Sequence, residues 1–154
     1  LEQRKALLAK AAGQRAAEFD SGKGIFLNYL PLQLPSDADP VTREFWEFYR
    51  TPRGIVIPEG RTLELTQNRM LTSEVRFMNF YPFNDLELIA PRPLLFITGD
   101  QAHSREFSED AYRKATGPKE LFWVPGAGHV DLYDRSNLIP WQKLTSFFNQ
   151  HLAA

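Results

Sequence analysis

The final third of the chain alternates short apolar runs with amphipathic stretches. The runs at 94–98 and 120–124 are mostly apolar, and each is soon followed by a glycine. Short runs of this kind are typical of strands buried on both faces of a parallel sheet. Between them, the segment from Ser104 to Ala115 carries apolar residues at helical spacing, and Ser104 is suited to capping its start. Strand, helix and strand in this order predict an α/β unit with two parallel strands.

Helices are predicted at both ends of the chain. Residues 1–19 carry an apolar stripe at helical spacing, and Gly22 is expected to end that helix. Pro140 suits the first position of a second helix, because its missing N–H costs no hydrogen bond there. The apolar face expected for that second helix consists of Trp141, Leu144, Phe148 and Leu152.

The middle of the chain gives weaker predictions because prolines interrupt its apolar runs. Residues 25–34 read either as an extended packing segment or as an edge strand, since Pro31 cannot donate a ladder hydrogen bond. Residues 42–50 predict a short helix almost encircled by aromatic side chains. Residues 62–80 fit no single element, and a short helical turn is expected within 82–93.

Two ionisable side chains follow the two predicted strands. Asp100 comes directly after the first strand, and His129 follows the second within a Gly-x-Gly-His sequence. Ligands of open α/β sheets bind beyond the carboxyl ends of the strands. A histidine base with an orienting carboxylate makes two-thirds of a nucleophilic triad. We therefore expect His129 to be catalytic with Asp100 as its acid, although Asp100 could instead cap the loop that follows it. Asp131 and Asp134 are expected in a solvated turn after the histidine, where they could also orient the loop or bind a polar group of the substrate.

Composition excludes several classes of protein. A length of 154 residues is that of one domain, and 43% apolar residues with 12 Phe, 5 Tyr and 3 Trp can form a core. The net charge of −1 is no electrostatic footprint for nucleic acid. No apolar run is long enough to cross a membrane. The absence of cysteine excludes disulfides and thiolate chemistry. It fits the cytoplasm, which we expect as the compartment, although many periplasmic proteins also lack cysteine.

The sequences RPLLFITGDQAHSREFSEDAYRKA and KELFWVPGAGHVDLYD, followed by the final amphipathic helix, resemble the C-terminal part of an α/β-hydrolase. Both segments are similar in sequence to the bacterial dienelactone-hydrolase-like branch of that family. The resemblance implies that residues 91–154 form the C-terminal part of the hydrolase core, with parallel strands and flanking helices. It implies a helical cap or insertion over residues 1–90. In that family the two last strands deliver the triad acid and then the histidine, which match Asp100 and His129 here.

One part of the family pattern is missing. The nucleophile of α/β-hydrolases lies in Gly-x-Ser-x-Gly, upstream of the acid and the histidine. None of the seven serines of this chain has that context. We therefore expect the chain to be the C-terminal half of a serine hydrolase of roughly 300 residues. Its partner would be the N-terminal half or a companion chain, its substrate a small ester-like molecule, and no cofactor would be needed.

Further residues are candidates for substrate contacts. His103 lies close to Asp100 in sequence and is expected to line the pocket, together with Trp46, Phe77 and Phe80. Two other functions remain open at this point. The chain could be a non-catalytic fragment or binding scaffold with a hydrolase-like fold, or His103, Asp100 and His129 could hold a metal ion.

Overall fold

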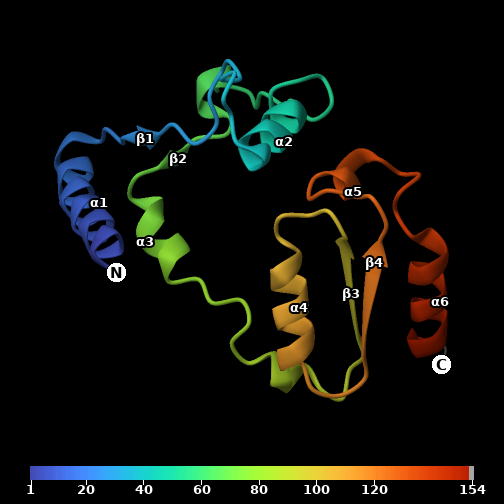
Figure 1. The fold of residues 1–154 in the computed structure, drawn as a ribbon. Coiled ribbons are helices and arrows are strands. Elements are labelled where there is room, and N and C mark those ends of the chain that lie inside the picture. The colour runs from blue at the N-terminus through green and yellow to red at the C-terminus, as the bar shows by residue number, and fades with distance from the viewer. Residues whose placement is uncertain (153–154) are drawn as a thin grey trace. The chain divides into compact units, whose positions relative to one another are not determined.

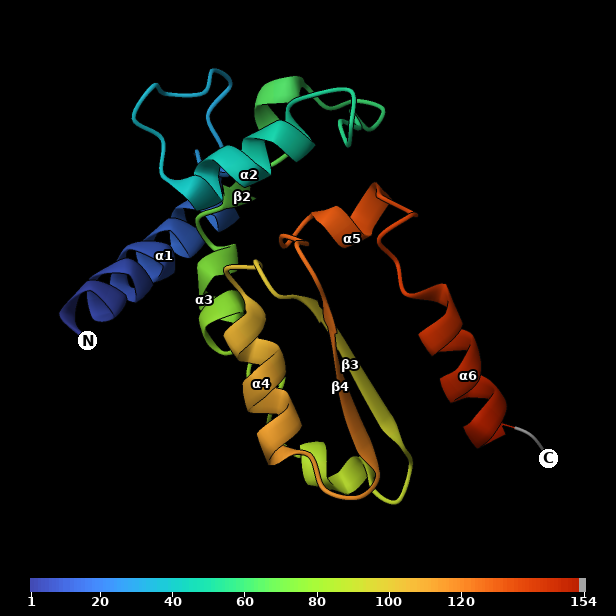
Figure 2. The ribbon, with the colours of Figure 1, turned by 45° about the vertical axis from the view of Figure 1, so that its right-hand side comes forward.

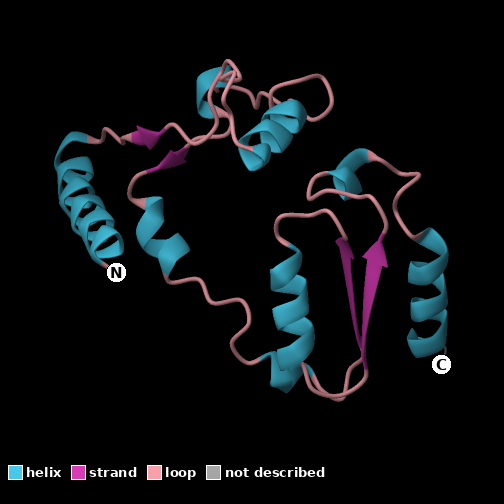
Figure 3. Ribbon diagram, in the orientation of Figure 1, coloured by secondary structure: helices cyan, strands magenta, loops and turns pink. Residues whose placement is uncertain are grey.

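The computed structural model describes residues 1–152. These residues form two compact units, Leu1–Pro82 and a second unit that begins at Phe83. The two units meet between Pro82 and Phe83, eight residues before the boundary expected after residue 90. The cap-like character of the N-terminal part stays a prediction. The elements (Figures 1 and 3) are, in chain order, α1 Glu2–Ser21, β1 Phe26–Leu27, α2 Pro40–Tyr49, η1 Leu63–Leu65, β2 Arg69–Met70, α3 Ser73–Met78, η2 Leu86–Ile89, β3 Leu94–Gly99, α4 Arg105–Lys114, β4 Lys119–Val124, α5 Asp131–Asp134 and α6 Trp141–Leu152.

The N-terminal unit contains the helix predicted at the start of the chain. α1 ends at Gly22, which adopts the left-handed conformation with φ 67° and donates its N–H to the Glu18 carbonyl. The extended segment expected after it contains the two-residue strand β1. This strand pairs antiparallel with β2, with Phe26 opposite Met70. Residues 62–80, which fitted no single element, therefore divide into η1, β2 and α3.

Arg50 fills the centre of the N-terminal unit. Its side chain is buried and donates to the carbonyl oxygens of Leu30 at 2.7 Å and Leu63 at 2.6 Å, and to the Thr66 hydroxyl at 2.9 Å. Burial lowers the pKa of the guanidinium from its ordinary value. One side chain thus joins three segments that lie far apart in the sequence.

Arg69 forms a second polar centre in the same unit. Its guanidinium lies 4.1 Å from the ring centroid of Tyr29 and 4.2 Å from that of Phe77. It also pairs with the buried carboxylate of Glu74 at 3.2 Å. Burial, followed by the hydrogen bond to Glu74, raises the pKa of the Tyr29 hydroxyl. Stacked and paired cations therefore hold this unit together beside its apolar contacts.

The C-terminal unit is built on the predicted pair of parallel strands. β3 and β4 run in register from Leu94 opposite Lys119 to Gly99 opposite Val124, and α4 connects them. Figures 1 and 2 both show this sheet between α4 and α6. The strand–helix–strand prediction is confirmed, and the chain has the α/β fold expected for this region.

Burial in this unit is less complete than predicted. Within β3 only Thr98 and Gly99 are buried, because a two-stranded sheet is too narrow to be covered on both faces. On α6 the buried residue is Phe147, at 8% exposure. Three of the four residues expected to face inward are exposed instead: Trp141, Phe148 and Leu152.

Residues 131–134 were expected to lie in a loop, but they form the short helix α5. Its first residue, Asp131, is only 14% exposed in its side chain and pairs with Arg135 at 3.2 Å. The prediction of a solvated turn is therefore wrong for Asp131. Among residues 1–152, no helix is both long and apolar enough to cross a membrane.

Candidate functional site

The carboxyl ends of β3 and β4 meet in a tight arrangement of backbone. A Cβ atom built on Gly99 would lie 2.1 Å from the carbonyl oxygen of Ala127, so only glycine fits at this end of β3. The same carbonyl accepts the backbone N–H of Gln101 at 3.0 Å. The backbone N–H of Asp100 donates to Val124 at 3.1 Å. The turn that carries His129 is thus fixed against the end of the neighbouring strand.

Two carboxylates bind the glycine amides of this turn. Asp100 Oδ1 accepts the N–H of Gly126 at 2.8 Å and the side-chain amide of Gln101 at 3.1 Å. Asp131 Oδ2 accepts the N–H of Gly128 at 2.8 Å. Gly126 has φ +73°, a conformation that side chains rarely adopt. The turn before His129 is therefore held from both of its sides by negative charge.

His129 has a hydroxyl at each ring nitrogen. Nδ1 lies 2.5 Å from Ser104 Oγ, and Nε2 lies 2.9 Å from the Tyr133 hydroxyl. The ring of His103 lies beside it, with a centroid distance of 4.7 Å and a tilt of 35°. The imidazole is half-buried and oriented by partners from α4, α5 and the end of β3.

Ser104 and Tyr133 were not predicted as partners of His129. Ser104 occupies the N-cap position of α4, as expected, but its side chain makes no capping hydrogen bond. The hydroxyl bonds to His129 instead. Tyr133 follows His129 by four residues, the spacing that brings side chains together over one helical turn. That spacing could have indicated the contact, whereas the Ser104 contact depends on the tertiary fold.

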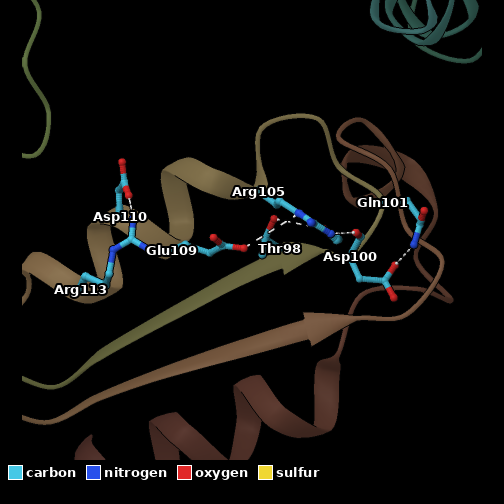
Figure 4. A network of polar contacts seen from close by, with 8 residues as sticks. Thr98, Asp100, Gln101, Arg105, Glu109, Asp110 and Arg113 are labelled. Carbon is cyan, nitrogen blue, oxygen red and sulfur yellow. Dashed lines mark hydrogen bonds and ion pairs between the residues drawn. The ribbon is translucent and has the colours of Figure 1, made fainter.

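Asp100 lies at the same rim as His129, but its carboxylate faces the turn. Within residues 1–152 it makes no hydrogen bond to the imidazole. Its backbone carbonyl accepts from Arg105 at 3.0 Å, and Arg105 also contacts Glu109 at 4.0 Å. Figure 4 shows Arg105 reaching from α4 to Asp100, whose carboxylate meets Gln101. The structure thus brings the two predicted catalytic residues to one place without joining them directly.

The predicted substrate-contacting aromatics Trp46, Phe77 and Phe80 belong to the N-terminal unit. Trp46 donates its indole N–H to the Leu32 carbonyl at 3.2 Å, and Phe77 stacks on Arg69 as described above. Phe80 is 68% exposed. Their role in binding substrate, like that of His103, stays a prediction.

The N-terminal unit also contains a cavity that the sequence did not indicate. Its volume is about 490 Å³, and its walls combine aromatic rings with a few polar groups. The lining residues are Tyr29, Leu30, Val41, Thr42, Phe45, Tyr49, Gln67 and Arg69. Such a lining has the character of a small-molecule pocket.

His103, Asp100 and His129, considered above as metal ligands, do not form a ligand cluster. Among residues 1–152 no three histidine, aspartate or glutamate side chains are grouped as a metal site would require. His103 and His129 stack as rings, and Asp100 binds backbone amide.

Two bacterial proteins are related to this chain in sequence. The chain is 39% identical over 154 residues to the uncharacterized protein PA2218 of Pseudomonas aeruginosa. This alignment covers 99% of this chain and 40% of PA2218. It is 29% identical over 123 residues to the uncharacterized protein YcjY of Escherichia coli, covering 78% of this chain and 38% of YcjY. The chain thus spans less than half of the length of these relatives. No family model matches it.

Solved structures resemble the chain over nearly its whole length. The crystal structure of PA2218 matches with a TM-score of 0.84 and 38% identity, over 98% of this chain and 46% of that one. The α/β hydrolase GrgF from Penicillium sp. sh18 matches with a TM-score of 0.72 and 20% identity, over 99% and 51%. DcsB, solved in complex with its substrate analogue, matches with a TM-score of 0.73 and 17% identity, over 98% and 52%. The chain therefore has the fold of about half of an α/β-hydrolase structure.

Proposed function

We propose that this chain is the C-terminal half of a serine hydrolase that cleaves small carboxylic esters or related acyl compounds. His129 acts as the general base and then as the general acid, and the nucleophilic serine comes from the upstream half of the protein. The serine attacks the acyl carbon, its proton moves to His129, and the proton then passes to the leaving alcohol. Water then attacks the acyl carbon and gives a proton to His129. The bond from the acyl carbon to the serine oxygen breaks, and His129 returns the proton to that oxygen as the carboxylic acid leaves.

The observation that carries this proposal is the fixation of His129 at the carboxyl ends of two parallel strands. An imidazole acts as a base only when it is held within hydrogen-bonding reach of the proton it takes. Ser104 and Tyr133 hold the ring at distances of 2.5 and 2.9 Å. The hydrolase-like fold of the chain supports the choice of acyl transfer, although fold alone does not determine the reaction.

Asp100 is the carboxylate of this proposed site. In the structure it acts on the Gly126 amide and thereby on the turn that carries His129. We propose that it supports the histidine through this turn. A carboxylate bonded directly to the imidazole would in addition stabilise the imidazolium, so the two roles respond differently to Asp100→Asn.

Two features support an upstream half as the partner. Among residues 1–152 the sheet holds just two strands, so the outer edges of β3 and β4 have no strand beside them. On α6 the side chains of Trp141, Phe148 and Leu152 are more than half exposed. Apolar side chains of this size in a row are typical of a surface that is covered in the complete molecule.

The substrate class follows from the proposed reaction. His103, whose ring lies beside that of His129, would contact the acyl group of the substrate. Contacts from Trp46, Phe77 and Phe80 stay an expectation from the sequence. We propose a cytoplasmic location, which a chain without cysteine fits.

The test uses the complete protein and a series of p-nitrophenyl esters. His129→Gln should lower kcat by about 10³-fold or more, because proton transfer from the nucleophile is lost. His151→Gln, on α6, is the matched control and should retain full activity. A fluorophosphonate should label one serine upstream of Leu1. An active His129→Gln variant would exclude the proposed mechanism, and absence of both activity and labelling would favour a binding scaffold.

Asp100→Asn separates the two possible roles of the acid. The amide oxygen can still accept the Gly126 N–H, so support through the turn predicts a loss of kcat below about tenfold. Direct pairing with His129 predicts about a 10⁴-fold loss, because the neutral amide favours the wrong tautomer. If Asp100 acts through the turn, Asp100→Ala should lower kcat more than Asp100→Asn does. If Asp100 pairs directly with His129, both substitutions should lower kcat equally.

A further inference from the structure

We infer that Ser104 is a positioning residue that selects the tautomer of His129. It accepts the proton of Nδ1 and leaves the lone pair of Nε2 available for the nucleophile. The inference rests on the proposed function, since it assigns to His129 the role of a base. It gives to a neutral hydroxyl a task that a carboxylate performs in the Ser-His-Asp triad.

The position of the Ser104 hydroxyl is fixed by its backbone. Ala102, two residues before it, is 4% exposed and accepts the N–H of Arg105 at 3.1 Å. The Ser104 carbonyl accepts the N–H of Phe107 at 3.1 Å, which begins α4. The side chain is not used for capping this helix, so its oxygen is available to the imidazole. The hydroxyl is thus part of a rigid turn between the end of β3 and α4.

The acidities of the two hydroxyls favour one position of the proton on His129 over the other. One arrangement has Nδ1–H donating to Ser104 and the Tyr133 hydroxyl donating to Nε2. The other has Ser104 donating to Nδ1, and Nε2–H donating to the tyrosine oxygen. A phenol is a far stronger acid than an aliphatic alcohol, so it is the better donor and the poorer acceptor. The first arrangement therefore has the lower energy.

This arrangement makes Nε2 the basic nitrogen. Tyr133 lies on the short helix α5 and is 52% exposed, so its hydroxyl can move away when a nucleophile approaches. Ser104, half-buried on the other side of the ring, keeps the proton on Nδ1 during that exchange. Asp100 and Ser104 then have separate roles at this site. Asp100 holds the turn that carries His129, and Ser104 selects the tautomer of its ring.

The experiment compares Ser104→Ala, Ser104→Thr and the control Ser108→Ala in the complete protein. Histidine is labelled with ¹⁵N, the ring nitrogens of His129 are assigned by their loss in His129→Gln, and their shifts give the tautomer above pH 8. The wild-type protein should show the Nδ1–H form. Ser104→Ala should lose this preference and lower kcat about tenfold with KM unchanged. Ser104→Thr, which keeps the hydroxyl, should restore both, and Ser108→Ala should change neither.

The failure of this inference can be told from failure of the proposed function. If the wild-type protein hydrolyses esters and Ser104→Ala leaves tautomer and kcat unchanged, the positioning role is wrong and the hydrolase function stands. If the tautomer responds but neither the wild type nor any variant hydrolyses an ester, the proposed function is wrong, and only the selection of the His129 tautomer by Ser104 stands. Fluorophosphonate attached to Ser104 itself would overturn the inference, because Ser104 would then be a nucleophile.

Discussion

The two compact units of the chain are stabilised in different ways. In the N-terminal unit, arginine side chains reach across the fold, and Arg50 alone bonds to Leu30, Leu63 and Thr66. In the C-terminal unit, the strands β3 and β4 form a regular ladder of six residue pairs, and small residues such as Ala111 lie in the core. One unit depends on a few long-range polar contacts, and the other depends on repeated local geometry.

This difference explains why the structure of the C-terminal unit is easier to predict from the sequence than that of the N-terminal unit. A ladder and its crossover helix repeat every two or every 3.6 residues, so the pattern of apolar residues reveals them. A guanidinium that bonds to distant carbonyl oxygens leaves no period in the sequence. It follows that single polar substitutions should damage the N-terminal unit most, whereas changes of side-chain volume at close backbone contacts should damage the C-terminal unit.

The largest effect is expected from Arg50→Leu. The substitution leaves the buried Leu30 carbonyl without its donor, whereas the Leu63 carbonyl keeps the Thr66 hydroxyl at 2.8 Å. An unsatisfied buried carbonyl costs about 1–3 kcal/mol. We expect the N-terminal unit to lose about 3 kcal/mol of stability, measured by urea unfolding. Arg43→Leu, within α2, is the control and should cost far less. Equal effects of the two substitutions would contradict the central role of Arg50.

A smaller effect, confined to the C-terminal unit, is expected from Gly99→Ala. The added methyl group would lie 2.1 Å from the Ala127 carbonyl oxygen, so the turn after β4 must move. Overpacking of this kind costs about 2 kcal/mol. Hydrogen exchange should speed up in β3 and β4 and stay unchanged in α1 and α2. A variant as stable as the wild type would show that the strand end tolerates displacement.

The smallest effect concerns Asp39, which caps α2. Its Oδ1 accepts the N–H groups of Val41 and Thr42 at 3.0 Å, and the Thr42 side chain followed by its backbone amide holds the pKa of Asp39 below 3.8. A depressed pKa means that the cap stabilises fully above pH 3.8 and is lost as the pH falls through the lower folded value. A carboxyl NMR titration of Asp39 should show this shift, and Asp39→Asn should remove the part of the pH dependence of stability that comes from this cap.

Much of the C-terminal unit could be predicted from the sequence. The strands, the crossover helix and the meeting of Asp100 and His129 at one rim follow from apolar runs that end at glycines. The hydroxyl partners of His129 could not be predicted in the same way. Ser104 has the local features of a helix cap, and only the tertiary fold shows that its oxygen faces the imidazole instead.

The N-terminal unit was predicted less well for a physical reason. α1 and α2 follow from local propensity and periodicity, but β1 and β2 are two residues long, too short to show alternation. The cavity beside Arg69 is formed by residues from three separate segments, so no local pattern indicates it. The exposure of the apolar face of α6 could not be predicted either, because a stripe at helical spacing does not show whether that face is buried.

The positions of the tryptophans have a practical consequence. Trp46, whose indole bonds to the Leu32 carbonyl, is the one tryptophan of the N-terminal unit, and Trp123 and Trp141 belong to the C-terminal unit. Emission from a variant that keeps only Trp46 therefore reports on the arginine-centred unit alone. Emission from the reciprocal variant reports on the strand pair. The two fluorescence signals would reveal whether the halves of this chain melt together or one after the other.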